Sequence, residues 1–258
     1  MLTQLKSICS VIALGILFTG CAITSTYDPC QVCNPFKVER NEIFSKVKTI
    51  AIVSIKMPSK MDRAPQIAER YESLITTELR RAGFKVVPSK EYAAVWDPMV
   101  KQIGGFFDPK TGQMDEKKFK TVRELSFREM ASKKNVDAFL LAGFTVTKAR
   151  WHGNTASWHG TTEATTGKEG FLASLAAAGA SGVVPALSLV VVISNPAGNT
   201  YYVNAGGIQL LMQYKGDFVS VPEHELFVDP GKDAKAVKIA LTPLMEGPKT
   251  KSSEQAGL

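Results

Sequence analysis

The amino-acid sequence predicts an α+β (α/β-like) domain: a central mixed sheet with βαβ units flanked by helices, preceded by a signal peptide and a flexible tether. Two observations predict the domain. Runs rich in β-branched residues alternate with runs whose apolar residues recur at helical spacing, and a strand, a helix and a second strand follow one another over residues 47–88. The chain has 258 residues, is 45% hydrophobic and carries a net charge of +7. It can therefore bury a core of ordinary size and is not disordered throughout.

The N-terminal segment indicates export and lipidation. Lys6 precedes an apolar run over Ile8–Phe18, which is too short to span a bilayer, and Thr19-Gly20-Cys21 follows. A small residue directly before Cys at this place is similar to the lipobox of bacterial lipoproteins. The resemblance implies that residues 1–20 are a signal peptide that is removed, and that Cys21 carries acyl chains such as palmitate. A plain secretory signal, or an N-terminal helix with a chance Cys, is the alternative.

The residue after Cys21 bears on which membrane the protein would enter. Ala22 stands where Asp would resemble an inner-membrane retention signal. We therefore expect an outer-membrane anchor, facing the periplasm, in which the acyl chains on Cys21 contact membrane lipid.

Residues 21–46 lack a sustained apolar period and are expected to form the lipidated tether. Cys30 and Cys33 form a Cys-x-x-Cys pair between two prolines there. In an oxidising periplasm we expect a local disulfide; redox activity, free thiols or thiols bonded to a partner are the alternatives. A zinc site would need two more ligands, and the mature chain has no second Cys pair.

The predicted domain spans residues 47–245 and opens with a strand, a helix and a strand. Val47–Ile55 is nearly continuously apolar, as a buried central strand is. A helix follows, with apolar positions at Ile67, Tyr71, Leu74, Ile75, Leu79 and Ala82. Phe84–Pro88 supplies the second strand. Ser89 is expected to cap a helix through Val95, which Asp97-Pro98 interrupts.

A loop with a turn at residues 108–112 leads to a basic helix. Asp115 is expected to cap this helix, which runs to about Lys134. The helical segment has seven Lys or Arg residues against four acids, a local balance of +3. The excess is consistent with a solvated helix face or with an anionic partner such as lipid headgroups.

Residues 137–149 (DAFLLAGFTVTKA) are predicted to form the next strand, and with the preceding elements they resemble a known family. The buried strand IAIV, the helix before GFKVV and the sequence ASKKNVDAFLLAG are similar to the TolB amino-terminal domain. The curli secretion lipoprotein CsgG, the penicillin-binding-protein activator LpoB and lipoproteins of the meningococcal GNA type share that arrangement. The resemblance covers about residues 47–245. It implies a binding or assembly role in an envelope complex without a catalytic site, and it assigns no functional residue beyond Cys21.

A repeated tripeptide marks a candidate partner-binding tip. Trp151-His152-Gly153 and Trp158-His159-Gly160 flank a predicted turn at Gly153-Asn154. Exposed aromatic rings at a hairpin tip would suit a protein partner or a membrane interface, and ordinary packing is the alternative. We expect no metal site, because odd spacing in one strand places the two His residues on opposite faces.

The stretch Gly170–Tyr214 holds 45 residues without one Asp, Glu, Lys or Arg. We predict a small-residue helix over 171–180 and a strand over 187–193. The insertion at about 170–195 could be a buried helix and strand, a contact with a neighbouring subunit, or a membrane-inserted element.

The remaining chain is expected to complete the sheet and end in a helix. Residues 200–214 read as one or two strands kinked at Gly206-Gly207, and residues 217–228 as an extended stretch. A last helix covers residues 233–245, and residues 246–258 form a disordered polar tail.

These features predict a non-enzymatic scaffold or accessory subunit of a cell-envelope assembly or secretion complex. The alternatives are an oligomeric, CsgG-like secretion component and an LpoB-like regulator of peptidoglycan synthesis. We expect no cofactor and no nucleic-acid partner, since the excess of 31 Lys and Arg over 24 Asp and Glu is small and dispersed. Envelope proteins and a homo-oligomer are the expected protein contacts.

Overall fold

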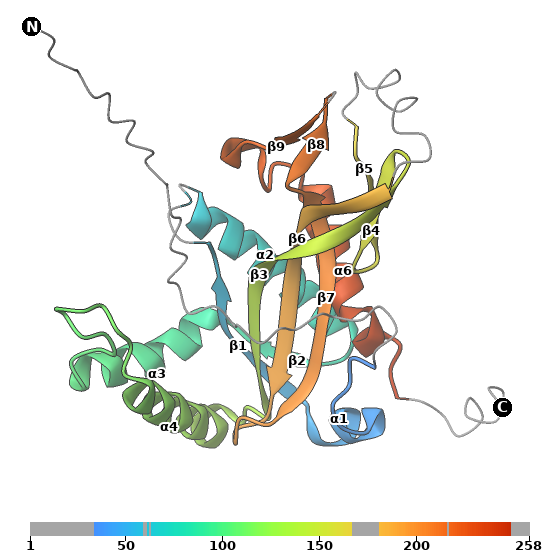
Figure 1. Cartoon of the computed structure of the whole chain (residues 1–258). Coiled ribbons are helices and arrows are strands. Elements are labelled where there is room, and N and C mark those ends of the chain that lie inside the picture. Colours follow the sequence, from blue (N-terminus) through green and yellow to red (C-terminus); the bar gives the residue numbers. More distant parts are fainter. Residues whose placement is uncertain (1–33, 59–60, 62, 167–180, 216, 249–258) are drawn as a thin grey trace, which may run out of the picture.

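The computed structural model describes residues 34–58, 61, 63–166, 181–215 and 217–248. It is a mixed α+β fold with a curled central mixed sheet flanked by helices, which confirms the predicted class (Figure 1). The elements are α1 (Arg40–Lys46), β1 (Thr49–Lys56), α2 (Ala64–Arg81), β2 (Lys85–Val87), α3 (Ser89–Gln102), α4 (Glu116–Lys134), β3 (Ala138–His152), β4 (Thr155–Trp158), β5 (Thr161–Ala164), β6 (Ser181–Ser194), β7 (Thr200–Leu210), β8 (Met212–Tyr214), β9 (Phe218–Ser220), the 3-10 turn η1 (Glu223–Glu225) and α6 (Pro230–Met245).

The sheet joins a parallel and an antiparallel part at β3. On one side, β1 pairs in parallel with both β2 and β3. On the other side, β3 pairs along its whole length with β6, from Phe139 opposite Ser194 to His152 opposite Ser181, and β6 pairs with β7. The C-terminal end of β3, residues 150–152, also pairs with β4, and β4 pairs with β5.

Helices cover both faces of the sheet, and successive side chains of β1 point alternately into the core on each face. Ile50 and Ile52 pack in the larger core with α1, α2 and α6, whereas Ala51 packs in a second core with α3 and α4. The second core includes stacked Phe127 and Phe139 rings, whose centroids are 3.8 Å apart. Figure 1 shows α3 and α4 side by side on their face of the sheet.

The part of the sheet formed by the end of β3, β4 and β5 curls, so that β5 lies beside the C-terminal end of β7. The Gly207 amide donates to the His159 carbonyl at 3.1 Å, and the Leu210 amide donates to Glu163 Oε2 at 2.7 Å. A third core, which includes Trp158, Ala186 and Leu210, fills the curl.

Two positions in β6 and β7 show how closely this part is packed. Pro185 is tolerated inside β6 because it lies where the pairing with β7 ends; its carbonyl accepts a hydrogen bond from the Leu211 amide at 2.9 Å. Gly206 lies against α6, where a Cβ atom would come within 2.0 Å of the Ala236 carbonyl oxygen. The kink was predicted at Gly206-Gly207; β7 is one strand in which both glycines pair with β6, and the pairing shifts register one residue later, at Ile208.

Most predicted elements are confirmed, and several bounds are corrected. The tether prediction is wrong for its last part: α1 forms, Ile43 is 1% exposed, and Phe36 packs edge-on against Tyr202 at 5.3 Å. Aromatic and aliphatic residues spaced too sparsely to show a period can still be buried by distant strands. The folded part therefore begins before Val47.

Two helices also differ from prediction. α3 continues through Pro98, because this residue is exposed and only one backbone hydrogen bond of the helix is lost there. Ser89 is the first residue of α3 rather than its cap, and its amide and hydroxyl both donate to Glu72. α6 starts earlier than predicted, with Asp229 as its N-cap.

Other predictions lie outside the described residues. These are acylated Cys21, the Cys30 and Cys33 pair, the helix over 171–180 and the tail beyond residue 248. The strand predicted over 187–193 is confirmed as part of β6. Among the helices that the structure describes, none has both the length and the apolar character needed to cross a bilayer.

Candidate functional site

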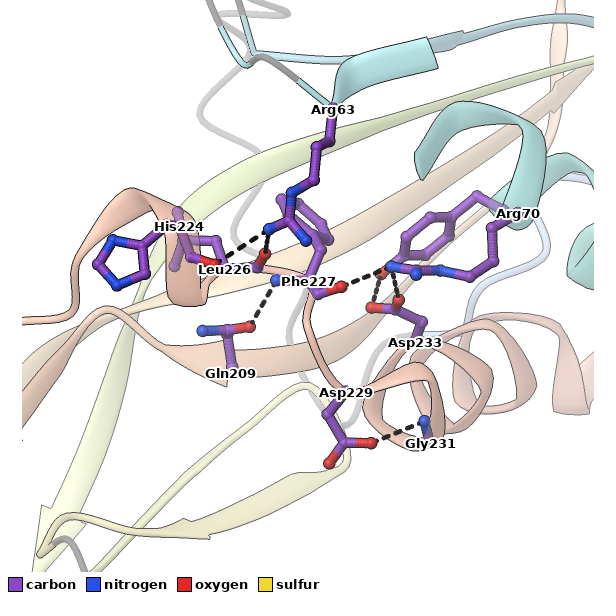
Figure 2. Close-up of polar contacts among 10 residues, drawn as sticks. Arg63, Arg70, Gln209, His224, Leu226, Phe227, Asp229, Gly231 and Asp233 are labelled. Atoms are coloured by element: carbon purple, nitrogen blue, oxygen red, sulfur yellow. Dashed lines mark hydrogen bonds and ion pairs between the residues drawn. The ribbon is translucent and has the colours of Figure 1, made fainter. Parts of the chain in front are cut away.

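The most elaborate polar site in the described part of the chain surrounds Asp233, in the first turn of α6. Its side chain is fully buried. Asp233 Oδ1 accepts a hydrogen bond from the Tyr71 hydroxyl at 2.7 Å, and Oδ2 forms an ion pair with Arg70 Nη2. Arg70 and Tyr71 are neighbours on α2, so the Asp233 carboxylate joins α2 to α6, two of the helices that cover the larger core. Figure 2 shows the contact between Arg70 and Asp233.

The same cluster fastens the segment that leads into α6. Arg70 Nη2 also donates to the Phe227 carbonyl at 2.7 Å, and the Phe227 amide donates to Gln209 Oε1 on β7 at 3.1 Å. Arg63 Nη2 donates to the carbonyls of His224 and Leu226, both at 3.1 Å (Figure 2). These contacts hold Phe227 at a φ of 58°, a left-handed conformation that is uncommon for a bulky residue.

Burial dominates the electrostatics of this cluster. Desolvation raises the pKa of Asp233 above its ordinary value, although the Tyr71 hydrogen bond and the Arg70 charge act in the opposite direction. Burial, with the neighbouring Asp233 charge, also raises the pKa of Tyr71. Both carboxylate oxygens thus face groups of the same chain, and the arrangement stabilises the position of residues 224–233.

The predicted aromatic tip is only partly where the sequence placed it. The turn at Gly153-Asn154 forms, but Trp158 is 2% exposed and donates from Nε1 to the Leu187 carbonyl at 3.2 Å. His159 is 7% exposed, with Nδ1 2.8 Å from Ser188 Oγ. These two residues pack inside the curled sheet because β4 turns its apolar face toward β6, so the expectation that they are exposed at the tip is wrong.

The other repeat lies nearer the surface. Trp151 is half-buried, with its ring 5.5 Å from Phe218, and His152 is exposed. Within the described ranges, no three His, Cys, Asp or Glu residues are grouped so that they could hold a metal ion.

A groove between α3 and α4 is one of the hollows that the described residues form. Its volume is about 820 Å³. The apolar residues in its lining are Met99 of α3, Ile103 directly after α3, and Val122 and Leu125 of α4; Arg128 and Glu129 of α4 also line it. Asp115 caps α4 as predicted, accepting a hydrogen bond from the Lys118 amide at 3.1 Å.

The sequence did not single out Asp233 or this groove. Asp233 occupies the buried face of α6 together with Val237, Ala240 and Leu244, at spacings of four, seven and eleven residues. A carboxylate at such a position signals a buried partner. The apolar position of Leu125 within a basic helix is the corresponding signal for the groove.

Comparisons with known proteins give distant structural likenesses. A PelC dodecamer from Paraburkholderia phytofirmans is similar with a TM-score of 0.34 and 11% identity, over 80% of this chain and 91% of that chain. Lipoprotein GNA1162 from Neisseria meningitidis is similar with a TM-score of 0.30 and 17% identity, over 62% of this chain and 81% of that chain. No family model and no curated protein matches. Because these TM-scores lie below 0.5, the likenesses do not assign a function.

Proposed function

We propose that this chain is an outer-membrane lipoprotein whose domain faces the periplasm and serves as a non-enzymatic scaffold or accessory subunit of an envelope complex. The acyl chains on Cys21 hold it at the membrane, and its folded surface binds other envelope proteins.

One observation carries the proposal: the short apolar run Ile8–Phe18 ends in Thr19-Gly20-Cys21. A segment of this length suits a signal peptide, and the small residue before Cys21 suits lipid modification. Two or three acyl chains anchor a protein stably, whereas one chain gives marginal binding.

The Asp233 cluster favours a binding role over a catalytic one. Its charges contact Arg70 and Tyr71 and fasten residues 224–233, and the groove at Met99 and Leu125 is mainly apolar. An apolar hollow with a polar rim is typical of a docking surface.

The test is metabolic labelling with an alkyne fatty acid, followed by detergent phase partition. We expect the chain with its natural sequence and the Cys9→Ala variant to be labelled and to enter the detergent phase. Cys21→Ala should lose both properties. Cys9→Ala is the matched control because its cysteine lies within the signal peptide. Labelling or detergent partition of Cys21→Ala at the level of the chain with its natural sequence would refute the anchor.

The scaffold role is tested in intact cells by crosslinking and purification of the anchored protein. We expect one or more envelope proteins to be recovered at constant ratio to it. Recovery of the chain alone, over a range of crosslinker lengths, would contradict the role even if the anchor is present.

A further inference from the structure

We propose that the α3–α4 groove binds an acidic segment of a partner protein that inserts apolar side chains between the two helices. The inference rests on the proposed binding role, but it is independent of the lipid anchor.

Part of the apolar lining of the groove remains exposed. Phe127 and Met130 of α4 are buried in the second core, and Val122, which lines the groove, is buried as well. Leu125 lies on the neighbouring face and is 42% exposed, in a helix that is otherwise strongly charged. Covering Leu125 would remove further apolar surface from water, so an occupant would be stabilised there.

The charges around the groove favour an acidic occupant. On α4, Glu124 is engaged by Lys120, and Glu129, which lines the groove beside Arg128, is engaged by Lys133. Arg128, which lies at the groove, has no acidic partner among the described residues. Lys117 and Lys118 likewise have no ion pair in the described part, and they precede Thr121, another residue of the lining, by about one turn. Carboxylates of an occupant would meet these cations.

The shape of the site favours a protein segment over a membrane surface. Leu125 and Met99 belong to the wall of a hollow of about 820 Å³. Membrane-binding faces present their apolar side chains outward into the headgroup region, whereas a groove receives side chains that project from a partner. An amphipathic helix with acidic residues beside its apolar stripe has the complementary form.

The experiment uses residues 21–258 with Cys21→Ser, which include every residue that the structure describes. The probe is a fluorescein-labelled designed peptide of roughly 18 residues, with Leu at helical spacing and Glu at the other positions. A twin peptide has Lys in place of Glu. Fluorescence anisotropy gives the affinity of both, at low and at high NaCl.

We expect the acidic peptide to bind, the basic twin to bind at least tenfold more weakly, and salt to weaken the acidic peptide. Arg128→Glu should weaken binding about tenfold and Leu125→Ala about fivefold. Two matched controls should leave the affinity unchanged: Arg81→Glu, an exposed charge reversal on α2, and Val146→Ala, an exposed apolar truncation on β3.

Three results would overturn the proposal. Equal binding of both peptides removes the charge argument, and unchanged affinity in both groove variants removes the site. If Arg128→Glu and Leu125→Ala instead reduce only the binding of phosphatidylglycerol vesicles, or only self-association of the chain in sedimentation, the occupant is a membrane or a second copy. The labelling experiment on Cys21 is unaffected by any of these outcomes.

Discussion

Asp233 and Tyr71 should be energetically coupled, and a double-mutant cycle measures the coupling. Tyr71→Phe removes the hydroxyl that donates to Asp233 Oδ1 at 2.7 Å and keeps the ring in its packing. A hydrogen bond to a charged group contributes about 2 kcal/mol to the free energy of unfolding. Asp233→Ala should cost about 4 kcal/mol, because it leaves the buried Tyr71 hydroxyl without its acceptor and Arg70 without its carboxylate.

The contribution of Arg70 is smaller than full burial would give. Its side chain is 32% exposed, so water can solvate the guanidinium once the carboxylate is gone. After Asp233→Ala, the further change Tyr71→Phe removes a hydroxyl that has already lost this acceptor. The double variant should therefore cost about 4 kcal/mol rather than the 6 kcal/mol that additivity predicts.

The assay is urea unfolding at pH 7, followed by circular dichroism and tryptophan fluorescence. Coincident transitions from the two probes would justify a two-state free energy. Costs that add to within about 0.5 kcal/mol would show that the two side chains act independently, and would refute the coupling.

Two further predictions concern the same core. Burial raises the pKa of Asp233 in the folded chain, so as pH rises from about 4 the carboxyl ionises in the unfolded chain before it ionises in the folded chain. The stability advantage of the natural chain over Asp233→Asn should therefore shrink until the pH passes the folded pKa. Urea unfolding at several pH values checks this, and an advantage that grows with pH would contradict it. Gly206→Ala should lower the free energy of unfolding by about 3 kcal/mol, since the new Cβ would lie 2.0 Å from a backbone oxygen of α6. In the control Gly143→Ala the Cβ would meet its nearest atom at 3.5 Å, and this change should cost less than about 1 kcal/mol. Equal losses of the two variants in thermal unfolding would show that α6 shifts away without cost.

Helices and strands were predicted well where a single local feature of the sequence, such as an apolar run or an N-cap residue, is enough to specify the element. The apolar run at Val47–Ile55 became β1, and the cap at Asp115 begins α4 as expected. The pairing of Phe36 with Tyr202 could not be predicted in this way, because the two residues are far apart in the chain and Phe36 belongs to no periodic run. Short segments gain their order from distant strands.

The candidate sites were harder to predict, because each depends on several elements. Asp233 contacts α2 through Arg70 and Tyr71, and Gln209 of β7 holds the segment that precedes it. Sequence spacing reveals that Asp233 is on an apolar face, but it does not reveal which helix supplies the cation. The Trp158 prediction failed for a related reason: a hairpin turn was recognised, while the curl that buries its second strand arises from pairing with β3 and contact with β7.

The uncharged stretch now has a physical explanation over the part that the structure describes. β6 lies between β3 and β7, and its residues Leu187, Leu189, Val191 and Ile193 belong to the larger core that α2 and α6 cover. A charge at these positions would be desolvated without a partner, so the absence of charge over 184–194 follows from a central position in the sheet, whereas residues 181–183 are exposed. On α4, by contrast, charge is abundant and Leu125 is the exception. Leu125 is exposed among the cations of α4 and also lines the α3–α4 groove, and this combination makes the α3–α4 face the surface where we expect a partner.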